Sequence, residues 1–167
     1  MKQLLLIRHG KSDWDHPGLA DHDRPLNARG LRDVPKMAAA LIQRAVKPDL
    51  VVSSTAVRAA TTARMIAGAM GYPLEDIIEV PGLYLAPPGV ILRAVQQLDE
   101  SAGTVMLFGH NPGMHEAVNA FSGDGQVTDF PTLAVARIEF EVEHWGLVEW
   151  GSGQLVDLIT PRHLVTG

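Results

Sequence analysis

The sequence contains no cysteine. This absence excludes disulfide bridges, thiolate metal ligands and every cysteine nucleophile, and it is typical of a reducing compartment. Long apolar runs are also missing near the N-terminus, where the run at residues 4–7 is far too short for a signal peptide or a membrane span. We therefore expect a cytoplasmic protein without a membrane partner.

Positive charge is in short supply. The 167 residues include 14 Lys and Arg against 19 Asp and Glu, for a net charge of -5. Because nucleic-acid surfaces depend on clustered Lys and Arg, this balance excludes a broad nucleic-acid interface, although it leaves room for a small electropositive pocket. With 46% hydrophobic residues, the chain is not disordered. Its length predicts a single domain over residues 1–167.

The alternation of apolar segments predicts an α/β sandwich with a mostly parallel sheet. Strands are expected at residues 3–7, 50–52, 77–80 and 104–108, with a half-exposed strand at 133–142. Helices are expected at residues 31–45, 56–70 and 90–98, with another that ends at Phe121. A loop is predicted at 16–29. An antiparallel edge is predicted from strands 147–150 and 155–159, joined by a turn at 151–153.

Three polar segments follow predicted parallel strands: 8–10 (RHG), 53–58 (SSTAVR) and 109–111 (GHN). Ligands of an open parallel sheet bind at the carboxyl ends of its strands. These segments lie far apart in the sequence, so only the fold can bring them together. We expect them to converge on one site.

The residues in these segments suit attack on a phosphoryl group. His9 is a competent nucleophile because an ordinary imidazole, with a pKa of about 6.5, is largely neutral at pH 7. Arg8 and Arg58 can stabilise the charge that develops on the phosphoryl oxygens, and a protonated His110 would add a donor. Arg58 also lies in a first helical turn, where a cation makes sense beside a bound anion. Taken singly, each residue also fits a structural or solvent-exposed role.

No histidine spacing points to a metal. His115 follows His110 by five residues, whereas a zinc-binding helix spaces two histidines by four. We expect neither a metal nor a cofactor, since the arginines supply the positive charge that a metal would bring.

The motifs resemble those of a known family. Residues 6–12 (LIRHGKS), 53–63 (SSTAVRAATTA) and 108–113 (FGHNPG) are similar, in order, to the three motifs of the histidine phosphatase (phosphoglycerate mutase-like) superfamily. The short chain and residues 23–30 (DRPLNARG) resemble its compact phosphohistidine phosphatase branch, the SixA type.

This resemblance implies a three-layer α/β/α fold, no cofactor and a phosphorylated intermediate on His9. Arg8, Arg58 and His110 would form the phosphate pocket, with Ser12 as a further substrate contact. The expected substrate is a phosphate-bearing partner, namely a phosphohistidine protein.

The sequence departs from the family at the general acid. Many members carry Glu or Asp soon after the third strand, but residues 83–89 (LYLAPPG) hold no carboxylate. Four other carboxylates are candidates, although we expect each to be solvated: Asp13, Asp15, Asp76 and Glu79. A protonated imidazole leaves without much help, whereas an alkoxide needs a proton. The departure therefore favours phosphohistidine substrates.

Three alternatives stay open at this stage. The first is a small-molecule phosphomonoesterase or mutase on the same scaffold. The second is a Mg²⁺-dependent phosphoaspartyl enzyme that uses residues 13–15 (DWD). The third is a catalytically silent phosphate-binding module, which would need the arginines but neither His9 nor His110.

Overall fold

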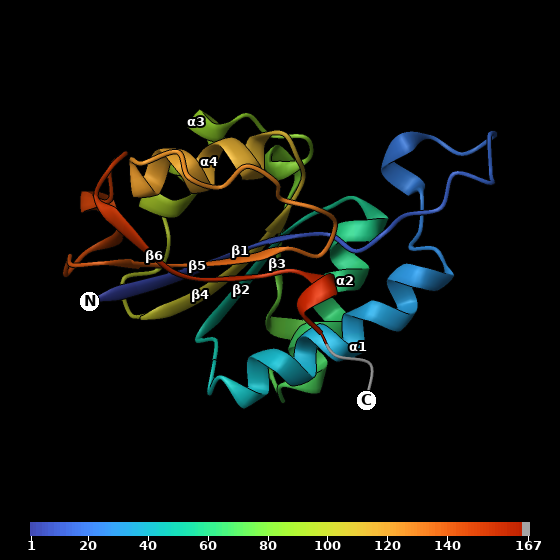
Figure 1. The fold of residues 1–167 in the computed structure, drawn as a ribbon, viewed down its shortest axis with the longest axis horizontal. Coiled ribbons are helices and arrows are strands. Elements are labelled where there is room, and N and C mark those ends of the chain that lie inside the picture. Colours follow the sequence, from blue (N-terminus) through green and yellow to red (C-terminus); the bar gives the residue numbers. More distant parts are fainter. Residues whose placement is uncertain (165–167) are drawn as a thin grey trace.

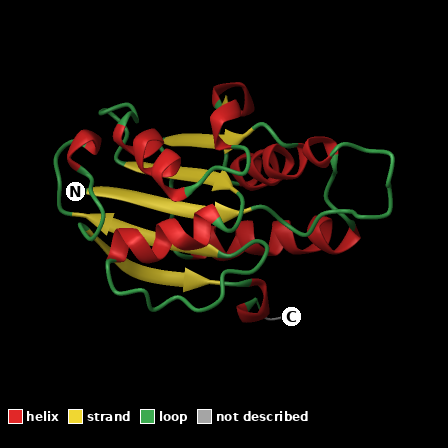
Figure 2. Cartoon of the chain, turned by 90° about the horizontal axis from the view of Figure 1, so that it is seen from above, coloured by secondary structure: helices red, strands yellow, loops and turns green. Residues whose placement is uncertain are grey.

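The computed structural model describes residues 1–164 and shows one mixed six-stranded sheet (Figure 1). Its strands are β1 (Lys2–Arg8), β2 (Leu50–Ser54), β3 (Ile78–Val80), β4 (Thr104–Gly109), β5 (Val135–Phe140) and β6 (Gly153–Ile159). They lie in the order β3-β2-β4-β1-β5-β6. β5 runs against both of its neighbours, as Figure 2 shows, and the other strand pairs are parallel. The predicted α/β class, mostly parallel with an antiparallel edge, is confirmed.

Two helical layers cover the sheet. The helices α1 (Ala28–Gln43) and α2 (Val57–Ala69) lie on one face, and α3 (Pro88–Gln96) and α4 (Gly113–Ser122) on the other (Figure 1). The apolar run of β1 does not alternate with polar residues because both of its faces are buried. Leu4 and Leu6 pack into the core beneath α3 and α4, and Leu5 and Ile7 into the core beneath α1 and α2. No helix within residues 1–164 is long and apolar enough to cross a membrane.

The predicted strand at residues 147–150 is wrong. A 3-10 helix, Trp145–Leu147, occupies its start, and the antiparallel edge is instead the β5–β6 pair. Trp145 is fully buried, and its indole N–H donates to the Ala102 carbonyl (2.8 Å). Trp145 and Val148 therefore pack into the core beneath α3 and α4, whereas Leu147 and Trp150 stay exposed. The predicted turn at 151–153 ends earlier, because Gly153 already belongs to β6.

Two helix starts also differ from the prediction. The loop expected through residue 29 ends at Asn27, which caps α1 by accepting a hydrogen bond from the Gly30 N–H (2.9 Å). Helix α2, expected from residue 56, begins at Val57, and its N-cap Ala56 makes no side-chain cap bond. Ser54 instead ends β2, and its hydroxyl accepts from the Ala56 N–H (3.2 Å).

The sheet register brings the predicted site segments together. β4 lies between β1 and β2 and pairs in parallel with both, with Arg8 opposite Gly109 and Ser53 opposite Phe108. The carboxyl ends of these three strands therefore meet at one edge. The segment around Ala86 also lies close to this edge. Gly113, at the start of α4, is so near the Ala86 carbonyl oxygen that a side chain at position 113 would overlap with that oxygen.

Candidate active site

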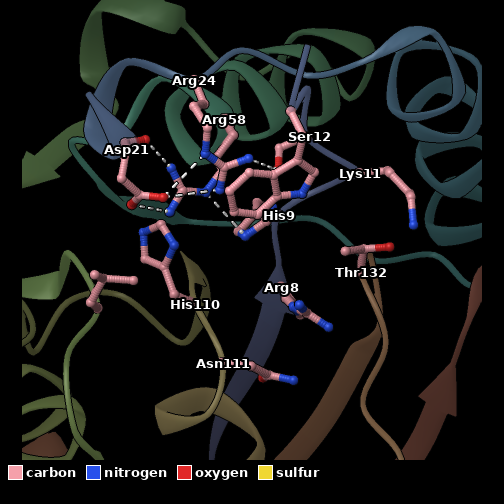
Figure 3. A pocket seen from close by; sticks show the side chains of 12 residues that line it. Arg8, His9, Lys11, Ser12, Asp21, Arg24, Arg58, His110, Asn111 and Thr132 are labelled. Atoms are coloured by element: carbon pink, nitrogen blue, oxygen red, sulfur yellow. Dashed lines mark hydrogen bonds and ion pairs between the residues drawn. The ribbon is translucent and has the colours of Figure 1, made fainter. Parts of the chain in front are cut away.

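A cavity of about 300 Å³ lies at this edge (Figure 3). Its walls combine the ends of β1 and β4, the first turn of α2 and the loop between β1 and α1 with one residue from each of two further loops. Every site residue predicted from the sequence lines it: Arg8, His9, Ser12, Arg58 and His110. The other lining residues are Lys11, Trp14, Asp21, Arg24, Leu85, Asn111 and Thr132.

The His9 imidazole is held as a neutral base with one free ring nitrogen. Its Nδ1 lies 2.6 Å from the Gly10 carbonyl, which can only accept, so Nδ1 carries the proton. Nε2 is thereby the unprotonated nitrogen, and it lies 3.4 Å from Nε of Arg58, which donates to it. Burial, reinforced by the charges of Arg58 and Arg8, lowers the pKa of His9 to about 3. At pH 7 the Nε2 lone pair is available for attack.

The backbone beside His9 is fixed to helix α2. The Gly10 N–H donates to the Thr62 hydroxyl (3.1 Å), which in turn donates to the Arg58 carbonyl (2.7 Å). A side chain at Gly10 would meet Leu26 and Val34 at 3.2 Å. This close packing favours glycine, and the two hydrogen bonds hold the nucleophile loop against the helix that carries Arg58.

Arg58 presents one edge of its guanidinium to His9 and is held by the other. Its Nη1 donates to the Asp21 carbonyl (2.7 Å) and its Nη2 to the Asp21 carboxylate (2.9 Å). The Nε edge faces His9 Nε2. Figure 3 shows this edge beside the His9 ring, so a phosphoryl group bonded to Nε2 would place an oxygen near the Arg58 Nε–H.

One ring nitrogen of His110, Nδ1, has no hydrogen-bond partner within residues 1–164. Its Nε2 lies 2.8 Å from the Ser54 hydroxyl, which already accepts from the Ala56 N–H. We infer that Ser54 donates its proton to Nε2, so Nδ1 carries the ring hydrogen. Nδ1 is buried without a partner in the described part of the chain. A bound phosphate oxygen would satisfy this donor.

The sequence suggested a protonated His110, but the environment favours the neutral ring. Burial and the Arg58 charge lower the pKa of His110 to about 4. It therefore acts as a single neutral donor at pH 7 unless a phosphate dianion beside it raises that pKa.

Arg8 and Ser12 complete the predicted set. Arg8 donates through Nη1 to the Phe130 carbonyl (3.2 Å), and its Nε is buried without a partner within residues 1–164. The Ser12 hydroxyl accepts from Arg24 (2.7 Å). Ser12 therefore contributes to the wall of the cavity while fixing a second arginine beside it.

Known proteins resemble this chain over much of its length. The pattern of the histidine phosphatase superfamily (branch 1) matches residues 4–83. An uncharacterised protein of Mycobacterium tuberculosis is 31% identical over 93% of this chain and all of its own length. An uncharacterised chloroplast protein of Arabidopsis thaliana is 34% identical over 73% of this chain, which spans only 60% of that relative.

Solved structures share both the fold and the extent of the chain. A candidate phosphohistidine phosphatase SixA from Agrobacterium tumefaciens is 29% identical, with a TM-score of 0.82 over 96% of this chain and 98% of that one. The chain belongs to the histidine phosphatase superfamily. A protein histidine phosphatase SixA complexed with tungstate (23% identity, TM-score 0.83, 98% and 99% covered) shares the fold. So does a phosphoserine phosphatase from Entamoeba histolytica (16%, TM-score 0.68, 99% and 100% covered).

The carboxylate in this histidine phosphatase pocket is one that sequence reasoning missed. Asp21 accepts from Arg58, from Arg24 (3.0 Å) and from the Tyr84 hydroxyl. The Tyr84 hydrogen bond, with those from Arg58 and Arg24, holds the pKa of Asp21 well below its usual range. Asp21 is therefore an anion and not a proton donor. The sequence offered no sign that separates it from the neighbouring Asp23.

The four carboxylates singled out from the sequence do not line the cavity: Asp13, Asp15, Asp76 and Glu79. Asp13 pairs with His16 (2.8 Å), and Glu79 pairs with Arg64 (3.4 Å). This placement leaves the phosphoaspartyl alternative without a nucleophile in the pocket. Within residues 1–164, no three His, Cys, Asp or Glu side chains form a group that could hold a metal ion.

Proposed function

We propose that this histidine phosphatase hydrolyses phosphohistidine on proteins, through a phosphorylated intermediate on His9. The observation that carries the proposal is the His9 ring itself. Its Nε2 is unprotonated, with a pKa of about 3 for the ring, and lies against Arg58 in a pocket that also holds Nδ1 of His110, which has no partner within residues 1–164.

In the first step, His9 Nε2 attacks phosphorus. The new Nε2–P bond forms as the P–N bond to the substrate imidazole breaks, and its electron pair goes to the departing nitrogen. Because the other nitrogen of that ring carries a proton, the substrate histidine leaves as a neutral imidazole. Arg8, Arg58 and the His110 Nδ1–H stabilise the charge on the phosphoryl oxygens.

In the second step, water attacks the phosphorus on His9. The Nε2–P bond breaks, its electrons return to Nε2, and the ring regains its neutral form with the proton on Nδ1. Phosphate leaves with both protons of the water. The Gly10 carbonyl bonds Nδ1 in the free enzyme and stabilises the positive ring of the intermediate.

The charge of Asp21 supports a substrate that needs no proton donor. It is the one carboxylate among the described residues that line the cavity, and it is ionised. A sugar or glycerate alkoxide would have to leave without general-acid help, which is worth roughly 10²–10⁴ in rate. The likeness to the SixA structure at 29% identity supports the same choice. A small-molecule phosphomonoesterase is the second candidate, favoured by the fold shared with a phosphoserine phosphatase.

The test is a side-by-side assay of one histidine-phosphorylated protein, a phosphoserine peptide and 3-phosphoglycerate. We expect the highest kcat/KM for the phosphohistidine protein, full activity in excess chelator and none in His9→Ala. The phosphoryl label trapped on the wild-type enzyme should be acid-labile and lie on His9. A higher kcat/KM for either ester would overturn the proposal in favour of the second candidate.

A further inference from the structure

A second cavity opens directly beside the phosphate pocket. It measures about 220 Å³ and is lined by Trp14, His16, Pro17, Leu19, Asp21 and Arg24. Three of these side chains also line the phosphate pocket, namely Trp14, Asp21 and Arg24. The two cavities therefore adjoin at these three side chains.

Trp14 is held flat at this wall although 74% of it is exposed. The Arg24 guanidinium lies 3.5 Å from the centre of the indole ring. Arg24 is itself buried and is fixed by the Ser12 hydroxyl (2.7 Å) and the Asp13 carbonyl (3.2 Å). The indole is therefore positioned before a ligand arrives, and its remaining surface is free to pack against a flat ring.

Asp21 gives the shared wall a negative charge. Its side chain is 42% exposed even though it pairs with Arg58 and Arg24, so part of the carboxylate faces solvent at the junction of the two cavities. A ring N–H or a cationic ring would be attracted to this position. Compared with a neutral side chain at this position, Asp21 disfavours a leaving group with its own carboxylate, in a pocket otherwise lined by Lys11 and three arginines.

We propose that the second cavity is the leaving-group subsite and that it takes a planar, neutral or cationic nitrogen heterocycle. Trp14 packs against the ring face, and the Asp21 charge favours a neutral or cationic ring over an anionic one. For a phosphohistidine protein this group is the imidazole of the substrate, so the choice of substrate rests on the proposed function. The same two residues act against carboxylated phosphate esters such as phosphoglycerate.

Two small phosphoramidates test the Trp14 contribution. N-phosphoimidazole and phosphoramidate both carry a P–N bond, but only the first carries a ring. In Trp14→Ala, we expect the ratio of their kcat/KM values to fall about five- to tenfold, the size of one aromatic contact. Trp14→Phe should restore most of the ratio. Trp150→Ala is the control, because Trp150 is half-exposed and packs against Phe121 away from both cavities.

The Asp21 contribution is tested by a different ratio. Asp21→Asn keeps a side-chain oxygen for Arg58 but removes the charge. We expect kcat/KM for 3-phosphoglycerate relative to N-phosphoimidazole to rise about tenfold, because one like-charge repulsion disappears. Any loss of Arg58 positioning affects both substrates and cancels in this ratio. Asp23→Asn is the control, since Asp23 lines neither cavity.

A binding measurement separates this inference from the proposed function. Calorimetry on His9→Ala measures the affinity for N-phosphoimidazole without turnover, and adding Trp14→Ala should weaken it about five- to tenfold. If the wild type hydrolyses no phosphohistidine protein but this loss of affinity is seen, the proposed function fails and the subsite stands. An unchanged affinity, or an unchanged ratio in either Trp14→Ala or Asp21→Asn, overturns the subsite.

Discussion

Ser54 should act on catalysis through His110. In Ser54→Ala, the Nε2 atom of His110 loses its 2.8 Å partner, and nothing then fixes the proton on Nδ1. The net value of such a hydrogen bond is about 1–1.5 kcal/mol, which corresponds to roughly a tenfold fall in kcat/KM. Removing the donor itself in His110→Ala should cost more, about 10²–10³.

The assay compares steady-state kcat/KM for a phosphohistidine substrate in the wild type and the variants. Ser53→Ala is a matched control, because Ser53 is buried in the same strand but its hydroxyl donates to the Ser54 carbonyl (2.9 Å) and not to His110. Since Ser54 also accepts from the Ala56 N–H, thermal unfolding of each variant must be measured to separate stability from activity.

A double-mutant cycle makes this prediction specific. If Ser54 acts only by orienting His110, Ser54→Ala should cost almost nothing in a His110→Ala background. The reasoning is refuted if Ser54→Ala lowers activity equally in both backgrounds, or if Ser53→Ala and Ser54→Ala have the same effect in the wild type.

Three further predictions concern pH, packing and charge. The pKa values of His9 (about 3) and His110 (about 4) are lowered in the folded state. The free energy of unfolding should therefore fall as pH drops from about 6.5 toward 3, by up to about 1.4 kcal/mol per pH unit for each ring. Denaturant titrations at pH 7 and pH 5 measure this fall, and His110→Ala should make the dependence of stability on pH less steep. Gly113→Ala should destabilise the protein by about 3 kcal/mol or more, because the added methyl group would overlap with the Ala86 carbonyl oxygen. The control is Gly89→Ala, whose methyl group would meet open space, and it should leave the melting temperature nearly unchanged. Arg58→Lys should lower kcat about as severely as Arg58→Ala, because a lysine ammonium cannot bond Asp21 and the phosphate at the same time. Near-normal activity in the lysine variant would show that the planar guanidinium of Arg58 is unimportant.

The sequence predicted the convergence of the site because that convergence depends on strand order and direction. His9 and His110 both follow short apolar runs, and such runs between helices become neighbouring parallel strands. By contrast, residues 147–150 have an apolar pattern that fits either an edge strand or a core-filling segment. Only the tertiary position of Trp145 decides between the two.

Contacts made by loops could not be predicted in the same way. Asp21 reaches Arg58 and Tyr84 because of the path of the loop between β1 and α1, which no local pattern specifies. Ser54 has the side chain of a helix cap, but it bonds a histidine 56 residues away. In both cases a residue with an ordinary local role gains its partner only from the fold.

The hydrogen bond between His9 and the Gly10 carbonyl makes the nucleophile unusually independent of its neighbours. Where a carboxylate orients a catalytic histidine, one substitution or one proton can remove the acceptor. Here the acceptor is a peptide oxygen, which no side-chain replacement deletes and which stays unprotonated in acid. The orientation of the ring should therefore survive every point change that leaves the main chain in place, and down to the pH at which His9 itself takes up a proton. Side-chain changes in the pocket can therefore weaken phosphate binding without changing which ring nitrogen attacks.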